Sequence, residues 1–483
     1  MGLVEHGRPL ASTIARMNRS ASDVTIQDPS RKVSETTILI VVVFLMSLVV
    51  RQLCFTGLIA SDDLGYSDFA LGIARGSYRL EPHHYAIRYG LLLPVAGFYH
   101  LFGAHVWTSV IVSMLSNSAA CVIAAIIARR YGGMPAAWIV GMLMATFPID
   151  VRYASTLVPE PIAALPIVAG ALLFLQARER SSLARGLAAG LCFGIGYLTK
   201  EPVAFVAMAF FVFALWRRDF ALAMQLAVGA GLVVMAELAW YWSQSHDLLF
   251  RPHAMAIHNN STAAVEANSN LSWRIWKAYP RLMLLPNEHF GLHSIFVLAL
   301  AALTVVRRRL KGDVLLLVLW AAVPYLYLNF GSSSFTHYWA LPLAPRYISL
   351  IYPPLFILAA MTLVDWWSRR RELRWGVMGA TALVSVVGIM AAWSTRATGY
   401  GTETVKRLQT ITATARTLHE PVCLTSADSA SWRLMLDLLD AELSCGSQGA
   451  VRVVMDSTGK PLAAPASTTR PSSPADTAPL PRS

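Results

Sequence analysis

Charged residues are scarce in this chain. Only 14% of its 483 residues are Asp, Glu, Lys or Arg, whereas 55% are hydrophobic. This balance excludes an ordinary soluble protein of this length and predicts an integral membrane protein. The first 35 residues are polar, basic and rich in serine, ahead of the first apolar run. We therefore expect no cleavable signal peptide and interpret 1–35 as a disordered cytoplasmic lead.

Cysteine is also rare, and common motifs of metal and nucleotide chemistry are missing. The five cysteines contain no CxxC pair, and the sequence has no HExxH, P-loop or glycine-rich dinucleotide motif. His83 and His84 could bind a metal beside a carboxylate, although adjacent side chains usually point apart. We expect no metal ligand set and no certain cofactor, and the need for a divalent cation stays open.

Basic residues exceed acidic ones, 40 to 28, but they form no continuous basic face. Most arginines fall in short clusters between apolar runs, which is how membrane proteins set their topology. We therefore predict no nucleic-acid partner. The clusters that we place on the cytoplasmic side are Arg129 and Arg130; Arg178, Arg180 and Arg185; Arg217 and Arg218; Arg307, Arg308, Arg309 and Lys311; and Arg369, Arg370, Arg371 and Arg374.

The apolar runs supply an even number of crossings between neighbouring clusters, as this placement requires. The predicted fold is an all-α polytopic membrane bundle of about 11 transmembrane helices within residues 36–395. Several runs are short for a span, so the count stays open by one or two. The runs are about 36–55, 106–128, 134–147, 157–176, 186–199, 202–216, 220–242, 290–306, 314–330, 346–364 and 376–393.

Two long stretches between runs are predicted to be external. Residues 60–103 mix charged with apolar residues at helical spacing, which is typical of juxtamembrane helices along the interface. Residues 243–289 interleave Trp and Tyr with cations. That composition suits a sugar platform or a lipid head-group surface, and simple anchoring at the membrane interface is the alternative.

The composition after Trp393 is that of a soluble segment. We predict a small external α/β domain over 396–462, in which 421–440 form a strand, a turn and an amphipathic helix. Cys423 and Cys445 would both face an oxidising compartment, which allows a disulfide between them. Residues 463–483 are rich in Pro, Ser, Thr and Ala and are interpreted as a disordered tail.

Two adjacent carboxylates, Asp62 and Asp63, follow the first apolar run, where a membrane helix meets water. A carboxylate at that boundary has a low dielectric on one side, so its pKa can shift and it can act as a general base. Acidic residues also simply end helices, and this alternative stays open. Tyr66 in the same stretch is a candidate substrate-binding residue.

A second acidic turn at 147–161 contains Asp150 and Glu160. An ionisable group that enters a membrane span costs about 2.5–3.5 kcal/mol on insertion scales, so it normally faces a cavity or a partner. Glu160, at the mouth of the next apolar run, is therefore a second catalytic candidate, and Asp150 is a substrate-binding candidate. Alternatively, Glu160 pairs with Arg152 and only stabilises the turn.

Three external cations are candidates for binding a phosphate. Lys200 lies at the tip of a hairpin at 197–202, and Arg88 and Arg346 each precede an apolar segment. A guanidinium stays charged and can donate two parallel hydrogen bonds to oxyanions. Anchoring at the membrane interface explains these positions as an alternative. His337, upstream of Arg346, is a further substrate-binding candidate.

Five features occur in a fixed order on the predicted outer side. They are an acidic pair after the first span, an interfacial helix with a proline, a second acidic turn, a TKxP hairpin, and Arg-Tyr before a proline-containing helix. Over about 36–364 this set resembles the GT-C fold membrane glycosyltransferases of the ArnT/protein-mannosyltransferase type, similar to glycosyltransferase family 39. The order and the sidedness of the set carry the resemblance, because no single motif is specific.

The chain departs from the family pattern at three places. Asp62-Asp63 stands where the family usually has Asp-Glu, and the common LTKG is LTKE at 198–201. The lysine and double proline of the first outer loop are absent, and Arg88 followed by Leu93-Pro94 occupies a similar place.

The resemblance implies transfer of a sugar from a polyprenyl-phosphate donor to an acceptor on the outer face, with inversion at the anomeric carbon. The acceptor would be a lipid, a polysaccharide or a protein. Asp62 would take the proton from the acceptor hydroxyl, and Asp63 or Glu160 would orient acceptor or base. The three cations would stabilise the leaving polyprenyl phosphate. We expect an integral protein of a bacterial inner (plasma) membrane, surrounded by its lipids.

Two other functions compete with the transferase. A transporter or flippase of lipid-linked sugars predicts inverted repeats and ionisable residues near mid-membrane. The sequence shows no repeat, and its charges lie mostly at the edges of the apolar runs. A non-enzymatic assembly protein would use the external segments as an interface, and its function would survive Asp62→Asn.

Overall fold

The computed structural model describes residues 29–260, 274–275, 278–285, 290–332, 338, 340–396, 402–419, 421–424, 429–439, 441, 451–455 and 461–464. The chain forms two units, Met1–Val42 and Val43–Ser483, and the packing described below lies within the second. His337 and Cys445, both singled out from the sequence, lie outside the described residues.

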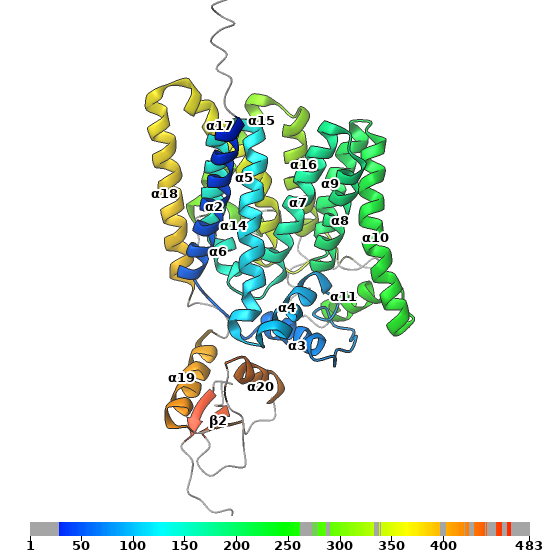
Figure 1. The fold of residues 1–483 in the computed structure, drawn as a ribbon, viewed down its shortest axis with the longest axis vertical. Helices are drawn as coiled ribbons and strands as arrows, with labels where there is room; N and C mark the ends of the chain where they lie inside the picture. The colour runs from blue at the N-terminus through cyan, green and yellow to red at the C-terminus, as the bar shows by residue number, and fades with distance from the viewer. Residues whose placement is uncertain are drawn as a thin grey trace, which may run out of the picture. The chain divides into compact units, whose positions relative to one another are not determined.

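Long helices dominate the described chain (Figure 1). Each predicted apolar run falls on one of them, and the run 346–364 begins in the 3-10 helix η1 (Pro345–Ile351). The helices are α2 (Pro29–Leu53), α5 (Val106–Ala145), α7 (Pro159–Arg180), α8 (Leu183–Thr199), α9 (Val203–Trp216), α10 (Phe220–Ser245), α15 (Gly291–Arg308), α16 (Gly312–Phe330), α17 (Tyr352–Arg369) and α18 (Arg371–Thr395).

Eight described helices are long and apolar enough to cross a membrane, and α8 and α9 are shorter apolar helices. Non-helical backbone at Gly132 and Gly133 divides α5 into two segments. A Cβ on Gly141 of the second segment would lie 3.6 Å from Ala125 of the first, so the two segments pack side by side. The predicted all-α polytopic membrane fold is confirmed, and the count of eleven crossings stays a prediction.

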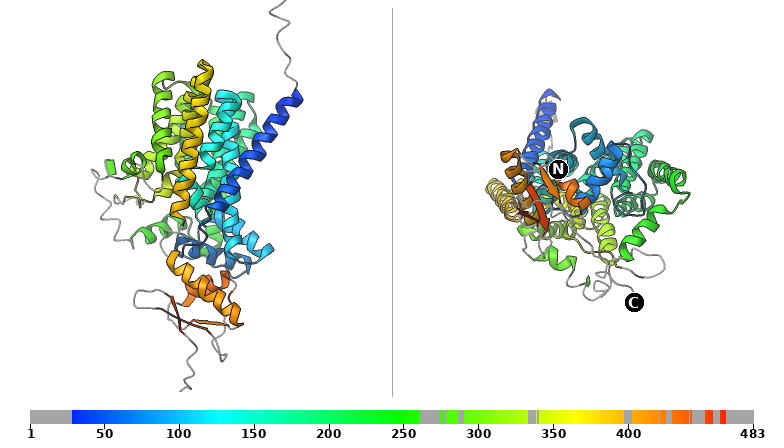
Figure 2. Two further views of the ribbon diagram at one scale, coloured as in Figure 1. Left: turned by 90° about the vertical axis from the view of Figure 1, so that its left-hand side faces the viewer. Right: turned by 90° about the horizontal axis from the view of Figure 1, so that it is seen from below.

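The membrane helices pack closely through small residues. Helix α8 lies between α7 and α10, while α15, α17 and α18 contact one another. Figure 2 shows the long helices of this part of the chain running alongside one another. A Cβ on Gly190 of α8 would meet the Leu226 carbonyl oxygen of α10 at 2.4 Å. Glycine at that position therefore lets two helix backbones approach, as is common between membrane helices.

Short helices gather at one end of this bundle. They include α3 (Asp62–Ala74), α4 (Tyr89–Phe102) and α11 (Phe250–Asn260), which lie below the long helices in Figure 1. Two further short helices are α6 (Pro148–Ala154) and α14 (Tyr279–Leu284). Helices α3 and α4 pack against each other. The helices expected within 60–103 are thus present, and their location along the outer interface stays a prediction.

The soluble segment forms helix α19 (Thr402–Leu418), helix α20 (Ser429–Leu438) and a three-stranded sheet of β1 (Val422–Leu424), β2 (Val451–Met455) and β3 (Pro461–Ala464). Strand β2 pairs in parallel with β1 and antiparallel with β3. The strand and the helix predicted within 421–440 are β1 and α20. Cys423 on β1 is disulfide-bonded.

Candidate active site

A charged cavity of about 230 Å³ collects predicted residues from four separate stretches of the chain. Asp62 comes from the first turn of α3 and Arg88 from the residue that precedes α4. Lys200 directly follows α8, and Arg346 lies in η1. The other lining residues are His84, Glu201, Pro202, Met255, Tyr327, Leu328, Leu341, Pro342 and Tyr347.

Asp62 faces the cavity between two donors. The Tyr85 hydroxyl donates to Oδ1 at 2.8 Å, and Arg346 Nη2 donates to Oδ2 at 2.5 Å. Burial acts to raise the pKa of Asp62, but Arg346 and Tyr85 outweigh it and hold the pKa below its ordinary value. A Cβ on Gly65 would lie 2.2 Å from the Tyr85 ring, so glycine leaves the room that this ring occupies.

Asp63 has a different environment although it is the next residue. Its side chain is fully buried, and its oxygens accept hydrogen bonds from the backbone N–H groups of Ile59 and Ser61, both at 2.6 Å. Burial raises the pKa of this carboxyl above its ordinary value. The contacts stabilise the turn before α3, and Asp63 is not among the residues that line the cavity.

Glu160 lies behind the cavity, in the first turn of α7, and is 1% exposed. Its carboxylate forms an ion pair with Lys200, and its Oε1 lies 3.5 Å from Arg346 Nε. Lys200 Nζ also lies 3.8 Å from the ring centroid of Tyr347. Burial lowers the pKa of Lys200 to about 8, with Glu160 opposing and Arg88 and Arg346 adding to this shift. Glu160 therefore belongs to the same cluster of charges as the predicted cations.

A close helix contact brings Arg88 to Lys200. A Cβ on Gly90, in the first turn of α4, would lie 2.1 Å from Thr199 Oγ1 and 2.8 Å from the Thr199 nitrogen. Only a residue without a side chain fits this approach. Gly90 follows Arg88 by two residues, and Thr199 precedes Lys200, so the contact sets the two cations on neighbouring walls of the cavity.

Glu201 and Arg251 form a buried network that sequence analysis did not single out. Glu201 lies 3.5 Å from Arg88 and accepts a hydrogen bond from Arg251 at 2.8 Å. Arg251 also pairs with Glu237 at 2.5 Å. Burial acts to raise the pKa of Glu201, but Arg88 and Arg251 lower it to about 2. In the sequence, the only sign of this network is Glu201 itself, which stands in LTKE where the family usually has the glycine of LTKG.

The structure places the remaining predicted residues in different environments. Tyr66 is buried beside the site, and its hydroxyl accepts a hydrogen bond from Arg88. Asp150 is 6% exposed and is not part of the cavity lining. Burial raises the pKa of Asp150 to about 7 against the opposing charge of Arg51. His337 lies outside the described residues. Within those residues no group of three or more His, Cys, Asp or Glu side chains could hold a metal ion.

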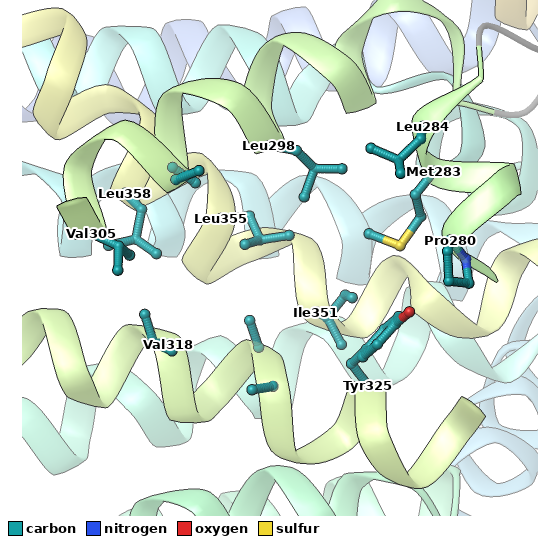
Figure 3. Close-up of a pocket in the computed structure, with 14 residues that line it drawn as sticks. Pro280, Met283, Leu284, Leu298, Val305, Val318, Tyr325, Ile351, Leu355 and Leu358 are labelled. Atoms are coloured by element: carbon teal, nitrogen blue, oxygen red, sulfur yellow. The ribbon is translucent and has the colours of Figure 1, made fainter. Parts of the chain in front are cut away.

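An apolar groove of about 390 Å³ lies among α14, α15, α16 and α17 (Figure 3). Met283 and Leu355 extend into it, and the Tyr325 ring points toward Pro280 at one end. Helix α16 and the 3-10 helix η1 each contribute to both linings: Tyr325 and Ile351 line the groove, and Tyr327 and Arg346 line the charged cavity. We call it the apolar groove.

Comparison with known proteins shows which proteins this chain resembles. Residues 92–242 match the family model described as dolichyl-phosphate-mannose-protein mannosyltransferase. Over this segment, about a third of its length, the chain is similar to the glycosyltransferases of this family. The crystal structure of ArnT from Cupriavidus metallidurans bound to undecaprenyl phosphate is similar to this chain, with a TM-score of 0.55, 16% identity and coverage of 87% of each chain. At this identity the match shows the fold. No curated protein matches the chain.

The family resemblance predicted from the sequence is therefore confirmed. The matched segment begins in α4 and ends in α10, so it includes Glu160, Lys200 and Glu201. Asp62, Arg88 and Arg346 lie outside the matched segment, and the structure brings them to the same cavity.

Proposed function

We propose that this protein moves a sugar from a polyprenyl-phosphate donor to an acceptor hydroxyl on the outer face of a bacterial inner membrane. The observation that carries the proposal is the convergence of one partly exposed carboxylate, Asp62, with Arg88, Lys200 and Arg346 around one cavity. A carboxylate can take a proton, and the cations can hold the phosphate that leaves.

Asp62 is the proposed general base. Its side chain is 28% exposed, so an acceptor hydroxyl can reach it from the cavity. The acceptor oxygen forms a bond to the anomeric carbon while the bond from that carbon to the phosphate oxygen breaks. The proton of the hydroxyl goes to Asp62, and the bonding electron pair leaves with the phosphate. Attack opposite the leaving group inverts the anomeric centre.

Arg88, Lys200 and Arg346 are proposed to bind the phosphate. Asp62 and Glu201 also line the cavity, and Glu160 lies behind it, so three carboxylates accompany the three cations before a donor binds. A sugar phosphodiester carries one negative charge and gains a second as the sugar leaves. Fixed cations in a site with little water stabilise charge that develops in the transition state. Because these cations come from the protein, the proposal needs no metal ion.

Glu160, Tyr66 and Asp63 are proposed to position these groups. Glu160 lies behind Lys200 and Arg346, so it holds both cations toward the cavity. Tyr66 does the same for Arg88. Asp63 keeps the turn that presents Asp62. We assign no role in the reaction to Asp150, because it does not line the cavity.

The apolar groove suits the isoprenoid chain of the donor. Its walls are almost entirely apolar, and Ile351 in its lining belongs to η1, the element that carries Arg346. A chain in this groove would place the attached phosphate near the cations. Burial of apolar surface stabilises such binding by about 25 cal/mol per Å². The ArnT structure that shares this fold contains undecaprenyl phosphate, which supports a donor of this class.

The test uses purified full-length protein in lipid nanodiscs and a panel of radiolabelled sugars on undecaprenyl phosphate. We expect label to move from at least one donor into an envelope extract, and Asp62→Asn to reduce the rate by about 10²–10⁴, the usual contribution of a general base. Asp68→Asn, an exposed carboxylate on the same helix, is the matched control. Donor binding without transfer in wild-type protein would favour a transporter, and transfer that survives Asp62→Asn would refute the assignment of the base.

A further inference from the structure

Glu201 is a carboxylate in a cavity that is proposed to bind an anion, and no step of the proposed reaction uses it. It lies between α8 and α9, its side chain is 18% exposed, and it is part of the cavity lining. A carboxylate repels a phosphate, so a negative charge at this position weakens phosphate binding. In this chain that charge stands where the family usually has a glycine.

Arg251 holds Glu201 in this position. Arg251 Nη1 donates to Glu201 Oε1 at 2.8 Å. The buried guanidinium also donates to Glu237 Oε1 at 3.0 Å and to the Ile87 carbonyl oxygen at 2.6 Å. Burial opposes the ionisation of Glu201, but Arg88 and Arg251 lower its pKa to about 2, so the carboxylate keeps its charge at neutral pH. Glu201 therefore presents a fixed negative charge to the cavity.

The other oxygen of Glu201 faces Arg88, one of the proposed phosphate-binding cations. Glu201 Oε2 lies 3.5 Å from Arg88 Nη2, farther than in a charge-assisted hydrogen bond of about 2.7–2.9 Å. Arg88 Nη1 donates to the Tyr66 hydroxyl. A phosphate oxygen that accepts from Arg88 Nη2 would lie at most about 6.5 Å from Glu201 Oε2. A phosphate at Arg88 therefore competes with Glu201 and is repelled by it.

Glu201 also balances the charge of its neighbours. Among the described residues it belongs to a set of ion pairs with two cations and two carboxylates, namely Arg88, Arg251, Glu201 and Glu237. Without Glu201 this set would have one positive charge in excess. Glu201 therefore offsets a charge that would otherwise hold an anion more tightly.

We infer that Glu201 is a specificity-determining residue that favours the lipid phosphodiester donor over the lipid phosphate monoester that remains after transfer. This inference rests on the proposed function. Repulsion by a fixed charge is proportional to the charge of the ligand. A phosphodiester carries one negative charge, whereas a phosphate monoester carries about 1.5 to 2 at pH 7. Glu201 therefore weakens binding of the product more than binding of the donor, and the product leaves more readily.

Two lipids with the same chain and different charge test the inference. Undecaprenyl phosphate is the monoester, and undecaprenyl methyl phosphate is a phosphodiester whose charge does not depend on an unidentified sugar. The dissociation constants of both lipids are measured near neutral pH for the purified full-length protein in lipid nanodiscs.

Glu201→Gln removes the charge and keeps an oxygen that can accept from Arg251. We expect this variant to bind undecaprenyl methyl phosphate about threefold more tightly than wild type and undecaprenyl phosphate about tenfold more tightly, because each negative charge gains by a similar factor. In the transfer assay, added undecaprenyl phosphate should inhibit this variant at about a tenfold lower concentration. Glu201→Asp keeps the charge and should keep the wild-type ratio of the two dissociation constants. If Glu201→Gln does not fold, Glu201→Gly tests the same ratio.

Glu237→Gln is the matched control, because it removes the other carboxylate partner of Arg251 and Glu237 does not line the charged cavity. This variant should leave the ratio of the two dissociation constants unchanged. An unchanged ratio in Glu201→Gln, or an equal shift in Glu237→Gln, would overturn the inference and leave the transferase standing. Wild-type protein that moves label from no donor would instead refute the proposed function, and the inference would fall with it.

Discussion

Arg346 donates a hydrogen bond to Asp62 at 2.5 Å, so the proposed base and one proposed phosphate-binding cation are directly paired. This pair lowers the pKa of Asp62 and makes it a weak base. A donor phosphate that binds Arg346 competes with Asp62 for the same guanidinium. Donor binding should therefore loosen the pair and raise the basicity of Asp62 at the moment when an acceptor proton must be removed.

Replacing Arg346 should affect both the rate and its pH dependence. We expect Arg346→Gln to lower kcat/KM about 10²–10³-fold, the usual effect of losing one donor to a developing oxyanion. Without Arg346 the pKa of Asp62 rises, so Asp62 becomes protonated at a higher pH. The acidic limb of the profile of kcat/KM against pH should therefore move to higher pH.

The control for this experiment is Arg75→Gln, an exposed arginine that directly follows α3. This variant should leave kcat/KM and its pH profile unchanged. If Arg346→Gln lowered the rate but left the acidic limb where wild type has it, Arg346 would bind phosphate without tuning Asp62.

The alkaline limb of the profile of kcat/KM against pH should report the ionisation of Lys200. Burial lowers the pKa of this ammonium group to about 8, so its charge is present below that pH and is lost above it. We expect kcat/KM, which reports the free enzyme, to fall above about pH 8. Arginine stays charged throughout this range. Lys200→Arg should therefore remove the alkaline limb while retaining measurable transfer. An alkaline limb that persists unchanged in Lys200→Arg would assign it to another group.

The sequence predicts the helices well, because long apolar runs and basic clusters reflect the cost of placing charge in a membrane. The same cost identifies Glu160 and Lys200, since an ionisable side chain beside an apolar run needs a partner. Each of the two residues is the other's partner in the structure. The divided helix α5 also follows from the sequence, because Arg129 and Arg130 separate its two apolar runs.

Other features depend on contacts that the order of residues does not reveal. Asp62 and Asp63 are the same residue type in adjacent positions, and only the direction of the first turn of α3 sends one to the cavity and the other to the backbone. Glu201 and Arg251 pair across 50 positions of sequence. Their role becomes visible only in the structure, where Arg251 of α11 reaches Glu201 just beyond the end of α8.

Breaking the buried pair of Glu160 and Lys200 should destabilise the protein. Glu160→Gln leaves Lys200 buried without its carboxylate, and loss of one partner of a buried pair costs about 3–5 kcal/mol. The double change Glu160→Gln/Lys200→Met removes both charges and should recover most of the stability but none of the transfer. Thermal unfolding of each variant in the same detergent measures these changes in stability.

An exposed pair provides the comparison for this series. Asp365 pairs with Arg308 at 2.6 Å, and both side chains are about one third exposed. Asp365→Asn should cost no more than about 1 kcal/mol, as is usual for exposed ion pairs. Equal losses in Glu160→Gln and Asp365→Asn would mean that burial does not strengthen the dependence of Lys200 on its partner.

Gly90 offers a test of the geometry itself without changing any charge. A Cβ at this position would lie 2.1 Å from Thr199 Oγ1 and 2.9 Å from the Ile195 carbonyl oxygen, so α4 and α8 must separate in Gly90→Ala. Overpacking of this kind costs about 1–3 kcal/mol. Because Arg88 and Lys200 sit at the ends of α4 and α8 that separate, we expect weaker binding of undecaprenyl phosphate and slower transfer.

Gly97→Ala, in the same helix with no atom within 4 Å of the added Cβ, should preserve both binding and transfer. Undecaprenyl phosphate binding that is equal in the two variants would show that the spacing of Arg88 and Lys200 does not matter for holding the phosphate.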